Sequence, residues 1–170
     1  GVTAALKYPA VYGLRGRDVL ELKIRIQPAA DPAGARSRVT ATERVICTLP
    51  ESPITALNEN CEGNRLAIGV AHAILWIDVA SGAIEEIHRV PDPNGYGGHV
   101  QWSHTNPDLL SYAGREHRLM VVDAREHRAW PAYREWPGEL VTHEHWWVDD
   151  QLVFCGGLHP KPTEDAHVKV

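Results

Sequence analysis

The sequence predicts an all-β fold, a β-propeller of four-stranded antiparallel blades, and three observations support this. Apolar runs are short and end at Gly, Pro, Asn or Asp, which is typical of strands and turns. No segment of the 170 residues has a convincing helical period. A four-strand pattern also recurs at intervals of about forty to fifty residues, which an open β-sandwich, the alternative architecture, has no reason to do.

The clearest blade lies between residues 53 and 90. Short turns rich in Gly, Ser and Asn separate the apolar runs in this stretch. Four antiparallel strands in about forty residues are the repeat of a propeller blade. The predicted strands are 53–59, 65–70, 74–79 and 83–90.

The same pattern predicts a second blade over 98–133 and the beginning of a third over 141–170. Upstream, 19–27 and 38–49 are predicted as the outer strands of an incomplete blade within about 1–50. A propeller typically needs at least four blades to close. We therefore expect a partial propeller of about three blades.

The composition limits the classes of partner. The net charge of −5 and the sequence pI of about 6.0 argue against nucleic acid or an anionic membrane as the partner. No apolar run approaches the length of a bilayer span. Three cysteines cannot all pair, so we expect a reducing compartment and a cytoplasmic protein.

Histidines point to a candidate metal site. His143 and His145 in VTHEHWW share one face of a predicted strand, because side chains alternate along a strand. His99 begins the first strand of the preceding blade. First strands line the channel of a propeller, so we expect the three imidazoles to converge and to suit a divalent first-row metal. The same spacing also fits solvated or hydrogen-bonded histidines that bind nothing.

Further side chains are placed by the same propeller pattern. Those expected near the three histidines lie in connections between second and third strands: His72, Arg115, His117, Arg118, His159 and Lys161. Three histidines are expected to have no functional role: His88, His104 and His127. Three tryptophans are expected to pack between blades: Trp102, Trp146 and Trp147. Asp78 and Asp123 are expected to be turn residues.

Two motifs, GHVQWSHTNPDLLSYAG (98–114) and VTHEHW (141–146), resemble the oligogalacturonate lyases. These are seven-bladed propeller enzymes of bacterial pectin breakdown. The positions that match the family pattern are Gly98, His99, Gln101, Ser103, Asn106, Pro107, His143, Glu144, His145 and Trp146. The order of the two motifs, one blade apart, is more specific than either motif alone.

The resemblance implies a manganese ion held by His99, His143 and His145. Leu140 stands where the family has a fourth ligand, a glutamine, so we expect water to take that position and Leu140→Gln to tighten metal binding. Glu144 is expected to face away from the site, because it lies between two histidines on a regular strand.

The implied reaction is metal-dependent β-elimination on an oligogalacturonate or a related uronate oligosaccharide. Arg115 and Arg118 would bind substrate carboxylates, with Gln101 and His117 as further substrate-binding candidates. His72 is the candidate base by location alone. The alternatives are a non-catalytic propeller module that binds a sugar or a protein partner, and an interaction propeller whose histidines cluster by chance.

Overall fold

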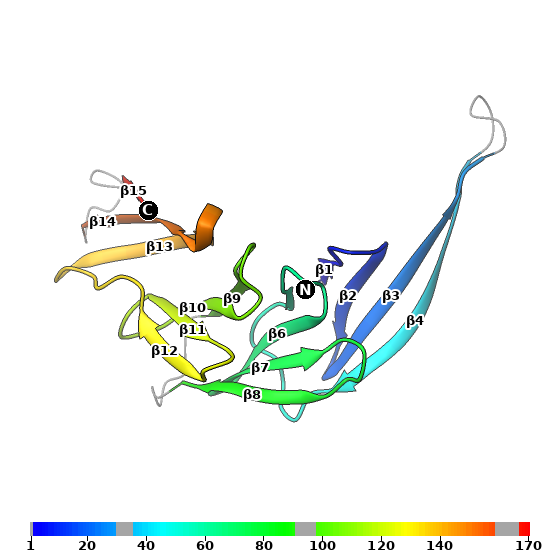
Figure 1. The fold of residues 1–170 in the computed structure, drawn as a ribbon, viewed down its shortest axis with the longest axis horizontal. Helices are drawn as coiled ribbons and strands as arrows, with labels where there is room; N and C mark the ends of the chain where they lie inside the picture. Colours follow the sequence, from blue (N-terminus) through cyan, green and yellow to red (C-terminus); the bar gives the residue numbers. More distant parts are fainter. Residues whose placement is uncertain (1, 30–35, 91–97, 159–166) are drawn as a thin grey trace.

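The computed structural model describes residues 2–29, 36–90, 98–158 and 167–170. His159 and Lys161, expected near the site, lie outside these described residues. The described chain is all-β apart from one short 3₁₀ turn, and its strands form four antiparallel sheets that follow one another in sequence (Figure 1). A series of separate sheets is the propeller arrangement and excludes the two-sheet sandwich.

The first sheet has four strands, where the sequence predicted only the outer two. The inner strands escaped prediction because the first has only three residues and the second contains Gly13, which weakens the strand signal. The outer strands form a long hairpin that projects from the body (Figure 1). The strands are β1 Val2–Ala4, β2 Ala10–Arg15, β3 Asp18–Gln27 and β4 Arg38–Thr48.

The second sheet begins with a much shorter strand than the predicted 53–59. Pro53 has no N–H to donate and makes only an isolated bridge with Val70. The hydroxyl of Thr55 accepts the N–H of Gly69 at 2.8 Å, so a side chain replaces part of the strand ladder. The strands are β5 Asn58–Glu59, β6 Arg65–Val70, β7 Ala73–Asp78 and β8 Ile84–Arg89.

The third and fourth sheets contain the histidine motifs. The third pairs its strands in the order β12-β11-β10-β9, and the described part of the fourth in the order β13-β14-β15. A short 3₁₀ turn, η1 Val148–Asp150, follows β13. The strands are β9 Gly98–Trp102, β10 Leu109–Ala113, β11 Leu119–Asp123, β12 Arg128–Pro131, β13 Glu139–Trp146, β14 Leu152–Leu158 and β15 His167–Lys169.

The core lies between consecutive sheets. In β6, Leu66 and Ile68 pack against the first sheet, whereas Ala67 between them packs toward the third. This alternation gives the central sheet two buried faces. A third cluster, which includes Val121 and Phe154, joins the third and fourth sheets. Face-to-face packing in series brings β9 and β13 side by side, and both strands contain site histidines.

Turn and tryptophan predictions are mostly confirmed. Asp78 accepts the N–H of Ser81 at 2.7 Å, and Asp123 accepts two backbone N–H groups of the next turn. Trp102 and Trp146 are 1% and 2% exposed within the cores between sheets. Trp147 was wrongly expected there: it is 56% exposed, because β13 ends at Trp146 and the chain turns into η1.

No helix in the described part of the chain is long and apolar enough to span a bilayer.

Candidate functional site

His99 and His143 occupy equivalent irregularities in neighbouring sheets. The pairing of β9 with β10 shifts register around His99, and that of β13 with β14 shifts around His143. Each histidine has a positive φ, 57° and 53° respectively. Only glycine adopts this region without strain, so both positions are β-bulges with an imidazole where glycine is favoured. Such strain recurs at functional sites and re-aims the side chains around it.

The bulge at His143 turns Glu144 into the protein, and the expectation that Glu144 faces away from the site was wrong. Its side chain is 0% exposed, and Oε1 lies 2.8 Å from Nδ1 of His99. Arg118 approaches the same carboxylate, with Nε 3.4 Å from Oε2. Sequence reasoning missed this because the alternation of side chains between two faces assumes a regular strand. Positions 142 and 143 are Thr142 and His143, and neither is a glycine that would signal a bulge.

His99 and His145 line one cavity of about 560 Å³. His104, expected to have no role, lines it too, and its ring lies edge-on to that of His145 with the centroids 5.0 Å apart. Gln101 lines the same cavity, and its amide donates to the carbonyl of Glu144 at 3.4 Å. The remaining lining consists of Ile54, Thr55, Ala56, Leu57, Asn58, Gly98, Val100 and Trp102.

The edge of this cavity is fixed by contacts between the third and fourth sheets. Trp146 donates its indole N–H to the carbonyl of Gln101 at 2.9 Å. Asp150 in η1 accepts the hydroxyl of Thr105 at 2.8 Å and also that of Ser103. These bonds hold β9, which contains His99, against β13, which contains His145.

Arg115, Arg118 and Leu140 line a different cavity, of about 390 Å³. Leu140 is 40% exposed there, so the effect of Leu140→Gln on metal affinity stays a prediction. His117 lies beside this cavity, with Nδ1 3.2 Å from Oε2 of Glu135, and the backbone N–H of Arg118 donates to the same carboxylate at 2.5 Å. Glu135 thus anchors the loop that presents both arginines.

His72, the base candidate, lies in the tight turn between β6 and β7 and is exposed. Its carbonyl accepts the N–H of Val90 at 2.9 Å. It belongs to the second sheet, whereas the other site histidines belong to the third and fourth. Its role as base stays a prediction.

The side chains at this site are of the kinds that bind the divalent metal predicted from the sequence. Neutral imidazoles are good ligands for divalent first-row ions, and a carboxylate behind a ligating imidazole, as Glu144 is behind His99, is the usual support. Within the described residues, however, no three His, Cys, Asp or Glu side chains are grouped closely enough to hold an ion. His143 is exposed on its bulge and does not line the cavity of His99 and His145. The convergence of the three histidines therefore stays a prediction.

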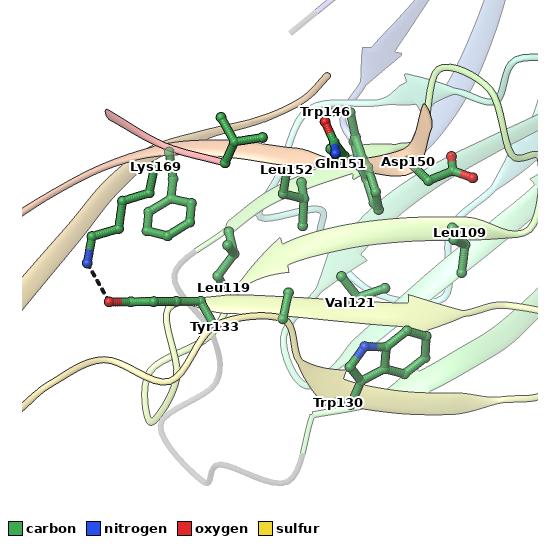
Figure 2. A pocket seen from close by; sticks show the side chains of 13 residues that line it. Leu109, Leu119, Val121, Trp130, Tyr133, Trp146, Asp150, Gln151, Leu152 and Lys169 are labelled. Atoms are coloured by element: carbon green, nitrogen blue, oxygen red, sulfur yellow. Dashed lines mark hydrogen bonds between the residues drawn. The ribbon is translucent and has the colours of Figure 1, made fainter. Parts of the chain in front are cut away.

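A third, mostly apolar groove of about 590 Å³ lies between the third and fourth sheets (Figure 2). Leu109, Val121 and Trp130 line it, and at one end Lys169 donates to Tyr133. Lys169 also bonds Glu139. Burial raises the pKa of Glu139, but hydrogen bonds from Lys169, Tyr133 and a backbone N–H bring it below its ordinary value. Among the residues that the structure describes, no histidine lines this groove.

Four sheets in series, with a histidine-lined cavity where the second, third and fourth sheets meet, define a β-propeller type of protein with a candidate binding site. The fold is that of the oligogalacturonate lyases, and the resemblance seen in the sequence is confirmed at this level. An oligogalacturonate lyase in complex with manganese aligns with a TM-score of 0.73 and 16% identity. An oligogalacturonate lyase from Vibrio parahaemolyticus aligns with a TM-score of 0.76 and 13% identity.

Both alignments cover 99% of this chain and 48% of the other, so the chain spans about half the length of these enzymes. No protein-family model matches the chain, and no curated protein matches it in sequence.

Proposed function

We propose that this chain forms part of a uronate lyase that cleaves oligogalacturonate by metal-dependent β-elimination. The observation that carries the proposal is the position of the two histidine motifs. On a fold shared with oligogalacturonate lyases over 99% of the chain, His99 of the third sheet and His145 of the fourth line one cavity.

His99, His143 and His145 would hold the ion, which the lyase in complex with manganese suggests is Mn²⁺. A divalent cation supplies Lewis acidity, which stabilises negative charge on a carboxylate. Glu144 supports this role because it binds Nδ1 of His99 and so holds the ring in place.

Arginines provide the second part of the proposal. Arg115 is exposed, and within the described residues no ion pair involves it, so its guanidinium can bind a uronate carboxylate. Arg118 is tied to Glu144 and lines the same cavity as Arg115. Both cations lie in the loop between β10 and β11, which suits an oligomer with a carboxylate on each sugar. Gln101 and His117 remain further candidates for contact with substrate.

The proposed chemistry removes the C5 proton of a uronate, which is weakly acidic because it lies next to a carboxylate. A neutral imidazole accepts the proton, and His72 is the candidate that the sequence offers. The electron pair forms a C4–C5 double bond while the C4–O bond breaks, and the leaving oxygen takes up a proton. Each cleavage yields one unsaturated uronate, and no pair of carboxylic acids is required.

A non-catalytic module that binds an anionic sugar is the second candidate. Leu140 at the position of the family's glutamine, and the absence of a three-donor group among the described residues, favour it. Such a module keeps Arg115 and the cavity but needs neither a base nor an ion.

A cytoplasmic location is also part of the proposal. The three cysteines, which are free thiols, are consistent with it.

The test is to incubate the full-length protein that contains this chain with digalacturonate and Mn²⁺, and to follow unsaturated uronate by ultraviolet absorbance. The proposal expects absorbance to rise, to stop with a chelator, and to return with Mn²⁺. Binding of digalacturonate without any product would favour the non-catalytic module.

A further inference from the structure

Glu144 is a buried carboxylate at the junction of two sheets, and the proposed chemistry uses it only as a support. Burial of a charge costs free energy unless partners compensate it. The partners of Glu144 are His99 and Arg118, from β9 and the entry to β11, whereas Glu144 belongs to β13. One side chain with no solvent exposure thus fixes an imidazole and a guanidinium of the neighbouring sheet.

The distance between Glu144 Oε1 and His99 Nδ1 determines where the imidazole proton lies. An ionised carboxylate only accepts hydrogen bonds, so a lone pair on Nδ1 would repel it at 2.8 Å. Nδ1 therefore carries a hydrogen. Arg118 Nη2 also approaches Nδ1, but at 3.5 Å, the outer limit of a hydrogen bond, and it does not compete with the shorter contact.

We propose that Glu144 is a positioning residue that fixes neutral His99 in the Nδ1–H tautomer. The Nε2 lone pair is then the only acceptor left on this ring, and the ring lines the cavity shared with His104 and His145. A histidine without such a partner favours the opposite tautomer, with the hydrogen on Nε2. Glu144 thereby determines which nitrogen of His99 binds an ion or a polar substrate group.

Arg118 is held by the same carboxylate. Its Nε and Nη2 lie 3.4 and 3.5 Å from the carboxylate oxygens of Glu144, and the attraction of opposite charges keeps the guanidinium beside the buried acid. Arg118 also lines the cavity that Arg115 lines. The N–H donors of its guanidinium that do not face Glu144 can bind another group. One buried acid therefore orients one residue of each cavity. The functional meaning of this arrangement rests on the proposed lyase site, whereas the tautomer itself does not.

The test is long-range proton–nitrogen correlation NMR on the full chain with ¹⁵N-labelled histidines, at alkaline pH where the imidazoles are neutral. His99→Gln assigns the signal of His99 by its loss. We expect the Nδ1–H pattern for His99 in the unaltered protein and the Nε2–H pattern in Glu144→Leu. His143, at the equivalent bulge, is the matched internal control and keeps its pattern in Glu144→Leu.

The spectrum of the unaltered protein is the first test, and an Nε2–H pattern for His99 in that spectrum overturns the inference. Because Glu144→Leu leaves Arg118 unpaired and the variant can fail to fold, Glu144→Leu/Arg118→Leu, which removes both charges, is the second variant. An unchanged His99 tautomer in either folded variant also overturns the inference. Titration with Mn²⁺ alone adds a second readout, in which loss of Glu144 weakens binding about tenfold or more. Absence of lyase activity with the Nδ1–H pattern present would contradict the proposed function and leave the tautomer assignment intact.

Discussion

His99 and His143 occupy the same left-handed bulge position in two neighbouring sheets, with φ values of 57° and 53°. This conformation is unfavourable by about 1 kcal/mol or more for a residue with a side chain, and by little for glycine. Two imidazoles at equivalent strained positions thus lower stability, and strain of this kind recurs at functional sites.

The strain predicts an unusual order of stability at His143. His143→Gly should be more stable than His143→Ala by about 1 kcal/mol, because only glycine relieves the positive φ. Urea unfolding measures the difference. His145, exposed on the same strand and without a positive φ, is the matched control, and there the glycine variant should be the less stable one. The same order at both positions would mean that the bulge is not strained.

Arg118 and Glu144 should be coupled in stability. Arg118→Leu leaves a buried carboxylate with one partner fewer and should lower the free energy of unfolding by about 2 kcal/mol or more. Glu144→Leu/Arg118→Leu should recover much of this loss, since no charge is left unpaired. Arg115→Leu, at an exposed position, should change stability by less than about 0.5 kcal/mol. A double-mutant cycle by chemical denaturation with no coupling would contradict the arrangement.

Glu21 makes the first sheet sensitive to acid. Burial raises the pKa of Glu21, but hydrogen bonds from Tyr8 and Arg44, at 2.7 and 2.9 Å, bring it below its ordinary value. A lowered pKa in the folded state contributes stability above the unfolded pKa of about 4.3, which is lost as pH falls toward the folded value. Glu21→Gln should therefore flatten the stability profile below about pH 5.

Thermal unfolding from pH 7 to pH 3 tests this expectation, with Glu126→Gln at an exposed turn as the control. Equal acid dependence in the unaltered protein and Glu21→Gln would show that the carboxylate is not held as described.

Cys47 should be slow to alkylate. Burial, aided by the charge of Asp18, raises the pKa of its thiol to about 11. At pH 8 only about one molecule in a thousand then has the reactive thiolate. Mass spectrometry after iodoacetamide should find Cys47 labelled far more slowly in the folded protein than in urea. Similar rates in both states would contradict its partly buried position.

The fold was largely predictable because strand signals are local. Runs such as Leu119–Asp123 and Ile84–Arg89 end in recognisable turns, and their repetition gives the blade. The inner strands of the first sheet were not predicted, because Gly13 weakens the local signal. The first strand of the second sheet was predicted too long, because Pro53 cannot donate to a ladder and long-range pairing decides where the strand begins.

The site was predictable in its residue types and not in its orientations. His99 and His145 do line one cavity, but one bulge moved Glu144 from the expected outer face to the interior. A bulge without glycine leaves no mark in the sequence. The position of His104 at this cavity was not foreseen for a related reason, since its contact with His145 depends on how two sheets pack.

The most direct test of the central claim is the release of unsaturated uronate from digalacturonate by the full-length protein with Mn²⁺, compared with its His145→Ala variant. The proposed lyase predicts a steady rise in ultraviolet absorbance that requires Mn²⁺ and is abolished by His145→Ala in a protein that remains folded. No rise above the rate without protein, or a rise that His145→Ala leaves unchanged, would contradict the claim.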